Sequence, residues 1–162
     1  RDRDLRRAYS RALSRTSRTL RTMVRREMRA GLDLRAASFL RARLRLSRFR
    51  PRGSGLGAVS LWVGTNDMPA TAFKGRPRQT ASGATVGGRS FPGAFVGTGQ
   101  SSGRRVVFRR RGRARLPIQA VTVPVQDEMN EILERQVFAE AGEIMMRNFR
   151  AELRARTIYG VG

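Results

Sequence analysis

The chain has 162 residues, 40% of them hydrophobic, and its 34 basic and 12 acidic residues give a formal net charge of +22. This size predicts a single domain, and the composition excludes an intrinsically disordered chain. The absence of Cys and His excludes disulfides, His-based catalysis and most transition-metal sites.

The large positive charge predicts an anionic partner, or acidic neighbouring subunits, because self-repulsion destabilises a compact monomer. No apolar run approaches the roughly 20 residues that a membrane span requires. We recognise no signal-peptide pattern either, and no membrane partner is expected.

Residues 3–30 predict one long helix, because apolar residues recur every three or four positions. This apolar stripe comprises Leu5, Tyr9, Leu13, Thr16, Leu20, Met23 or Val24, and Met28. Arginines fill most of the other positions, either as the solvated face of a core helix or as a face toward DNA or an acidic partner. Gly31 suits the end of this helix and Asp33 suits the N-cap of the next.

A short helix is predicted over residues 34–41, followed by an antiparallel hairpin. Leucines alternate with arginines and serine between residues 43 and 49, which indicates a strand. A turn at 51–55 leads to a second strand at 58–64. We expect one face of this hairpin to carry Arg43, Arg45 and Trp62, with either an arginine–tryptophan contact or simple packing of the ring.

Residues 66–89 predict a long loop, because they are rich in Gly, Pro, Thr and Ala. A loop of this length is usually functional or ordered by a partner, so we expect it to be the most mobile part of an isolated subunit. Short strands are conceivable at 72–73 and 84–86.

The basic hairpin (residues 93–115) is the most distinctive stretch. Strands are predicted near 93–98 and 104–109, joined by a polar, glycine-rich loop. Seven arginines accompany the second strand and its exit: Arg104, Arg105, Arg109, Arg110, Arg111, Arg113 and Arg115. Neighbours on a strand alternate between faces, so Arg109 and Arg111 should share one face and Arg110 the other.

A last apolar stretch at 120–123 precedes a second long helix at 125–156. Its apolar stripe includes Val125, Met129, Val137 and Phe149. Residues 125–162 hold five basic and seven acidic residues, whereas residues 53–124 hold eleven basic and one acidic. A basic body with a mildly acidic terminal helix suits self-association, although each acidic residue is as well explained by pairing within its own subunit.

These elements predict an α+β fold, a small antiparallel sheet or sandwich flanked by a long N-terminal and a long C-terminal helix, in one domain over residues 1–162. We find no catalytic constellation and no cofactor or metal motif. Gly97-Thr98-Gly99 lacks the strand, helix and lysine context of a phosphate-binding loop. We therefore expect no enzyme activity.

The central stretch resembles the minor tail protein Z family of lambda-like siphophages and prophages. The resemblance rests on FPGAF at 91–95, on the basic hairpin with its phenylalanine, and on RLPI at 115–118. Residues 12–16 are similar to the family's first helix, and residues 41–46 to its basic first strand. The match follows the family's order over nearly the whole chain and is weakest at 66–89.

The resemblance implies a tail-completion protein of the virion that is assembled in the host cytoplasm. Such proteins form rings, commonly sixfold, around the DNA channel at the head-proximal end of the tail. The implied partners are further copies of the chain, the tail terminator or tail tube, the head–tail connector, and phage DNA bound without sequence specificity.

In this interpretation two sets of residues are expected to make contacts. Contacts with DNA or with an adjoining ring are expected at Arg43, Arg45, Arg104, Arg105, Arg109, Arg110, Arg111 and Arg113. Subunit contacts are expected at Phe91, Phe95, Glu131, Glu134 and Glu140. The alternative is a stand-alone, sequence-nonspecific nucleic-acid-binding protein of ribosomal or nucleoid type, which net charge alone fits equally well.

Overall fold

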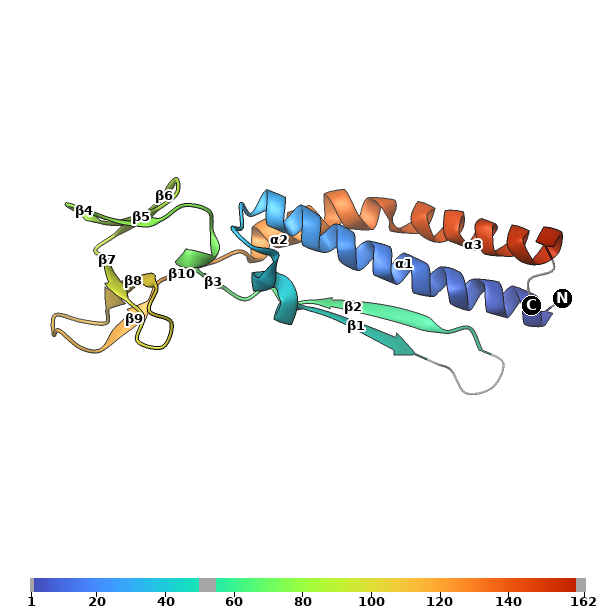
Figure 1. The fold of residues 1–162 in the computed structure, drawn as a ribbon, viewed down its shortest axis with the longest axis horizontal. Coiled ribbons are helices and arrows are strands. Elements are labelled where there is room, and N and C mark those ends of the chain that lie inside the picture. Colours follow the sequence, from blue (N-terminus) through green and yellow to red (C-terminus); the bar gives the residue numbers. More distant parts are fainter. Residues whose placement is uncertain (1, 50–54, 160–162) are drawn as a thin grey trace. The chain divides into compact units, whose positions relative to one another are not determined.

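The computed structural model describes residues 2–49 and 55–159, and these fall into two compact units (Figure 1). Unit 1 comprises Arg1–Glu27, Leu40–Gly64 and Asn130–Gly162, and unit 2 comprises Met28–Phe39 and Thr65–Met129. Each of these units has buried apolar residues of its own. The single domain over residues 1–162 stays a prediction.

Helix α1 (Asp2–Gly31) confirms the predicted N-terminal helix. Its end differs from the prediction, because Asp33 rather than Gly31 takes the left-handed conformation, at φ 54°. The amide of Leu34 donates to the carbonyl of Arg29 at 2.9 Å, and the amide of Asp33 donates to that of Ala30 at 3.2 Å. This is the Schellman pattern, which satisfies the last carbonyls of a helix.

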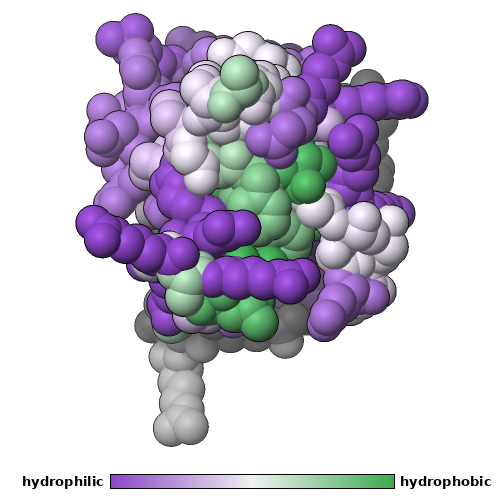
Figure 2. Space-filling model, turned by 90° about the vertical axis from the view of Figure 1, so that its left-hand side faces the viewer, coloured by the Kyte–Doolittle hydropathy of each residue, from purple (hydrophilic) through white to green (hydrophobic). Residues whose placement is uncertain are grey.

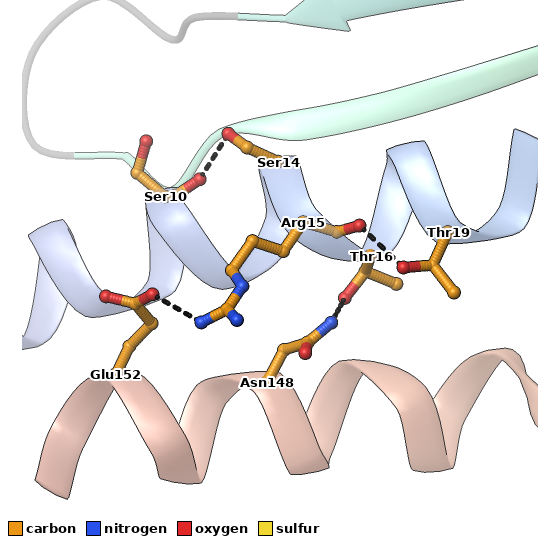
Figure 3. A network of polar contacts seen from close by, with 7 residues as sticks. All are labelled: Ser10, Ser14, Arg15, Thr16, Thr19, Asn148 and Glu152. Atoms are coloured by element: carbon orange, nitrogen blue, oxygen red, sulfur yellow. Dashed lines mark hydrogen bonds and ion pairs between the residues drawn. The ribbon is translucent and has the colours of Figure 1, made fainter. Parts of the chain in front are cut away.

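In unit 1, α1 packs against α3 (Ala139–Tyr159) through small residues and a polar ladder (Figure 3). Ala8 and Ala12 are fully buried. Asn148 Nδ2 donates to Thr16 Oγ1 at 3.0 Å, and Arg15 pairs with Glu152 at 3.1 Å. The buried residues in the N-terminal half of α1 are thus small, which lets the two helices approach closely there, whereas Met23 and Val24 are buried further along.

The leucines of the predicted apolar stripe of α1 are less buried than the small residues between them. Leu5 is 50% exposed, and Leu13 and Leu20 are half-buried. Leu13 and Leu20 line a cavity whose other walls include Leu61 of the first hairpin. A helix with neighbours on two sides buries a wider face than a single stripe, so its leucines flank the centre.

The first hairpin is confirmed and also belongs to unit 1. Strand β1 (Leu44–Phe49) pairs antiparallel with β2 (Ala58–Val63). The predicted turn at 51–55 lies almost entirely outside the described residues. The predicted short helix is instead the 3₁₀ segment η1 (Ala37–Arg43), which leads directly into β1.

The C-terminal helix is confirmed as three consecutive helical segments, α2 (Gln126–Ile132), the π-helical η3 (Leu133–Phe138) and α3. Met129, Leu133 and Val137 are all buried and are spaced by four residues. That spacing exceeds the 3.6-residue turn of an α-helix, and the wider π turn keeps all three on the buried side.

Unit 2 contains two three-stranded antiparallel sheets that pack together, and a short β3–β10 pair. Its remaining elements are β3 (Met68–Pro69), η2 (Ala70–Ala72), β4 (Pro77–Thr80), β5 (Gly83–Val86), β6 (Arg89–Pro92), β7 (Phe95–Thr98), β8 (Arg105–Arg110), β9 (Ile118–Ala120) and β10 (Thr122–Val123). Phe73, Met68, Val86 and Val107 are buried in its core. The architecture of helices and small antiparallel sheets is the predicted α+β fold.

The predicted long loop at 66–89 is wrong, because these residues form β3, β4, β5 and the start of β6. Ala84 and Val86 are buried, and Gln79 ties the two sheets together. The Gln79 side chain accepts from the amide of Val96 at 2.8 Å and donates to the carbonyl of Gly83 at 2.7 Å. Strands of four residues joined by two-residue turns give too little periodicity to stand out from a loop.

Candidate interface on the basic hairpin

The basic hairpin folds as predicted and gains a third strand. Strand β7 pairs with β8, Phe95 opposite Phe108, and β9 pairs with the other edge of β8. The loop between β7 and β8 closes through the amide of Gly99, which donates to the carbonyl of Arg104 at 2.9 Å, and through Gly103 at φ 62°. The arginines of β8 are thereby fixed on a central strand.

Arg109 and Arg111 share one face of this sheet, as the alternation predicted. Arg109 Nη2 donates to the carbonyl of Pro92 at 3.1 Å, and Arg111 Nε donates to Gln119 Oε1 at 3.0 Å. Gln119 lies directly opposite Arg109 in the register. Both arginines are exposed, yet each has one side-chain hydrogen bond that restricts its rotamers.

Arg110 lies on the opposite, outer face with the aromatic pair. The Phe95 and Phe108 rings are 5.9 Å apart, and the Arg110 guanidinium lies 5.8 Å from the Phe95 centroid. Both rings are only half-buried, whereas Val107, on the other face, is 1% exposed. Figure 2 views the sheet-bearing side of unit 2 and shows an apolar patch bordered by hydrophilic side chains.

No carboxylate in the described part of the chain forms an ion pair with any of the seven arginines of the basic hairpin. Unit 2 holds thirteen basic and four acidic residues. Of those four, Asp33 pairs with Lys74 at 2.9 Å and Glu128 with Arg89 at 3.7 Å, outside the hairpin. The hairpin therefore presents a concentrated positive charge that the carboxylates of residues 2–49 and 55–159 leave uncompensated.

Arg43 and Arg45, the other two arginines of the predicted contact set, belong to unit 1. Arg43 Nη1 donates to the carbonyl of Gly64 at 3.5 Å. Arg45 is exposed and lies opposite Trp62, with its guanidinium 5.6 Å from that ring. The expected arginine–tryptophan contact is thus present, and it provides a second exposed arginine–aromatic pair.

The predicted subunit-contact residues divide into three groups. Phe91 is 9% exposed in unit 2, so it is a core residue and is not available to another subunit. Phe95 lies on the open face described above. Glu131 forms an i,i+4 ion pair with Arg135 at 3.0 Å, whereas Glu134 and Glu140 are exposed without an ion pair among the described residues.

Sequence reasoning named Phe95 as a subunit contact but missed Phe108, which lies beside it on the same face. The signal was the register of the two strands, which places Phe95 opposite Phe108 on the side away from Val107. Within residues 2–49 and 55–159, no cluster of acidic residues is arranged to hold a metal ion. None of the helices there is both long and apolar enough to cross a membrane.

The comparison with protein families identifies the family of this chain. Residues 2–158 match the model of the family described as prophage minor tail protein Z (GPZ). The searches of curated proteins and of solved structures each found no match. Because the family model spans almost the whole chain, the chain belongs to the prophage minor tail protein Z family and is a structural protein of a phage tail.

Proposed function

We propose that this chain forms a homo-oligomeric ring, commonly sixfold in such assemblies, at the head-proximal end of the tail. The ring surrounds the DNA channel, completes the tail and prepares it for joining to the head. Its role is structural, without catalysis. Family membership supports the location in the tail, and the neck position is part of the proposal.

The observation that carries the proposal is the uncompensated charge of the basic hairpin. Seven exposed arginines lie together on one sheet and its exit loop, and none forms an ion pair within the described chain. Arginine binds carboxylate and phosphate in a bidentate manner, so both kinds of neighbour satisfy such a surface. A neck ring has both: acidic residues of an adjoining ring, and the DNA inside the channel.

We assign the hairpin arginines mainly to contacts with an adjoining protein ring. A ring subunit has more protein neighbours than phosphates, and the outer face combines Arg110 with two half-buried phenylalanine rings. Aromatic and arginine residues are enriched in protein interfaces. DNA contact by the remaining arginines would be sequence-independent and strongly dependent on salt.

The test uses two double variants with equal charge change. Arg105→Ser with Arg113→Ser removes arginines whose side chains make no hydrogen bond or ion pair in the described chain, so the fold should be unaffected. Arg18→Ser with Arg25→Ser, on the exposed side of α1, is the matched control. Both are used to complement a phage that lacks the gene, and both are measured for binding to duplex DNA.

We expect the hairpin variant to yield few joined particles and the α1 control to yield near-normal numbers. If the arginines contact DNA, the plot of the logarithm of the DNA-binding constant against the logarithm of the salt concentration becomes less steep by roughly 0.9 for each lost phosphate contact. Normal particle yield with a reduced slope would contradict the neck proposal and favour a stand-alone nucleic-acid-binding protein. Normal yield with an unchanged slope would show that the hairpin has neither role.

A further inference from the structure

The arginines of α1 gather on one ridge of the helix. Residues 5–26 hold eight arginines and no acidic residue. An α-helix turns by about 100° per residue, so four of these arginines lie within about 40° of one another around the helix axis. The arginine ridge comprises Arg7, Arg11, Arg18 and Arg25. All four are exposed, belong to unit 1 and extend over about 27 Å of helix.

The fold pairs the arginines beside the ridge and leaves the ridge itself positive. Within unit 1, α3 and the first hairpin lie on two other sides of α1 (Figure 1). Glu152 pairs with Arg15 at 3.1 Å, and Glu27 pairs with Arg26 at 2.6 Å. None of the four ridge arginines forms an ion pair in the described part of the chain.

The positions between the ridge arginines are polar. Ser14 and Thr22 occupy the two seven-residue intervals, and each donates its hydroxyl to the backbone carbonyl four residues earlier, at 2.8 and 3.1 Å. The leucines of α1 lie on its other side, toward the cavity beside the first hairpin. Protein interfaces have an apolar core that is depleted in charge, whereas arginine, serine and threonine are typical of phosphate contacts. The ridge therefore favours a nucleic-acid backbone over a protein partner.

A hollow next to the ridge has the lining of an anion site. It has a volume of about 390 Å³ and is lined by Arg7, Ser10, Arg11 and Arg156. Three guanidinium groups and one hydroxyl border it, without a carboxylate or an apolar side chain. Arg156 comes from α3, so both long helices of unit 1 contribute. Arginine binds phosphate oxygens in a bidentate manner, and this lining suits a phosphate group at the ridge.

We propose that the arginine ridge of α1 is the surface that binds the phosphates of duplex DNA, without sequence preference. Duplex DNA carries one negative charge per about 1.7 Å of its axis, so a ridge of about 27 Å meets phosphates along its whole length.

This proposal deepens the proposed function and rests on it for the presence of DNA in the channel. It divides the two anionic neighbours of the ring between two surfaces. The ridge faces DNA, and the basic hairpin, whose outer face carries the Phe95–Phe108 pair, faces the adjoining protein ring.

The first test measures the salt dependence of DNA binding by the purified chain. Arg7→Ser with Arg11→Ser and Arg18→Ser with Arg25→Ser each remove two ridge arginines. For each double variant, the plot of the logarithm of the binding constant against the logarithm of the salt concentration should become less steep by about 1.8, which is roughly 0.9 for each lost phosphate contact. Two duplexes of equal length and different sequence should give the same result.

Arg147→Ser with Arg154→Ser is the matched control. Both residues are exposed on α3, and the charge change is the same. This variant should keep the native steepness, and circular dichroism verifies that every variant is folded. Ridge variants with native steepness would overturn the proposal. So would a control that loses as much as they do, because net charge alone would then explain the binding.

The second test locates the DNA directly. The chain has no cysteine, so a single introduced cysteine takes a photoreactive cross-linker at one known position. Thr22→Cys places it between two ridge arginines, and Ser60→Cys places it on the exposed face of the first hairpin as the control. We expect several-fold more cross-linked DNA from Thr22→Cys. Equal yields from the two positions would contradict the assignment.

Particle assembly separates this proposal from the proposed function. DNA binding is measured on the purified chain and does not require a ring, whereas the neck position is judged by the yield of joined particles. The variant Arg18→Ser with Arg25→Ser should bind DNA with a reduced salt dependence and still join particles. Unchanged DNA binding with few joined particles would show that the ridge contacts an acidic protein instead, and would overturn the proposal.

Discussion

At the residue scale, Asp33 shows a local conflict between sequence and backbone. Its φ of 54° lies in the left-handed region, where glycine is favoured and most other residues are strained. Its carboxylate pairs with Lys74, and its carbonyl accepts from the amide of Lys74 at 2.9 Å. Both side chains of the ion pair are more than half exposed, so the pair itself contributes little.

Asp33→Gly should therefore stabilise the protein by roughly 1 kcal/mol, because the relief of backbone strain outweighs an exposed ion pair. Denaturant unfolding measures this change in the free energy of unfolding. Lys74→Met is the matched control, which removes the ion pair alone and should change stability by less than about 1 kcal/mol. Destabilisation by Asp33→Gly would show that the carboxylate has a larger role than the backbone.

The arginines of the basic hairpin are not equivalent at this scale either. Arg109 and Arg111 are each held by one hydrogen bond to the neighbouring backbone or side chain. Arg105 and Arg113 have no such bond in the described chain. The former keep a preset orientation for a partner, whereas the latter must be ordered by the partner itself.

At the element scale, the β4–β5–β6 sheet packs against the face of the basic hairpin that carries Val107. Sheet β4–β5–β6 packs against β7 and β8, and Gln79 joins the sheets through the amide of Val96. Val107 is buried on the side of β8 that also carries Arg109, whose guanidinium reaches the carbonyl of Pro92 on β6. The candidate interface thus depends on strands that the sequence suggested were a loop.

Deleting residues 76–86 tests this dependence. The deletion removes β4 and β5 together, and with them Ala84 and Val86 from the core. A flexible loop would tolerate the loss, but we expect unit 2 to lose its native structure, seen as rapid proteolysis between residues 65 and 125. Trp62 belongs to unit 1, so its fluorescence reports that unit separately. A native proteolysis pattern in the deletion variant would contradict the observed sheet.

The long elements were predictable because their patterns repeat. The long helices follow from an apolar period of 3.6 and the first hairpin from a period of 2. The basic hairpin follows from two β-prone apolar runs joined by a glycine-rich loop. The four-residue strands around Gly83 were predictable only in part. A strand at 84–86 was conceivable and is present as β5, but a pattern of period 2 over four residues does not distinguish a strand from a loop. Phe91 was misplaced at an interface because a lone phenylalanine beside proline and glycine does not reveal which side of a sheet it occupies.

The contacts of the candidate site were predictable only in part. Alternation along β8 placed Arg109 and Arg111 together, and the hydrogen bonds are consistent with it. Phe95 and Phe108 stay only half-buried because the β4–β5–β6 sheet covers the opposite face of their strands. Such contacts between segments distant in the sequence cannot be read from the local pattern.

At the scale of the whole molecule, both units are basic. Unit 2 has thirteen basic and four acidic residues, and the remainder of the chain has 21 and eight. A ring brings several such subunits together, and their mutual repulsion must be offset by negative charge nearby. A position next to an acidic ring and around DNA supplies that charge, whereas a position among equally basic copies alone does not.

The most direct test of this account is to locate the chain in the particle by cryo-electron microscopy of intact virions. The account predicts a closed ring of this subunit at the head-proximal end of the tail, with residues 104–115 facing either DNA density or acidic residues of an adjoining ring. Subunits found along the tail shaft or at its distal tip, or a single copy without ring symmetry, would contradict it.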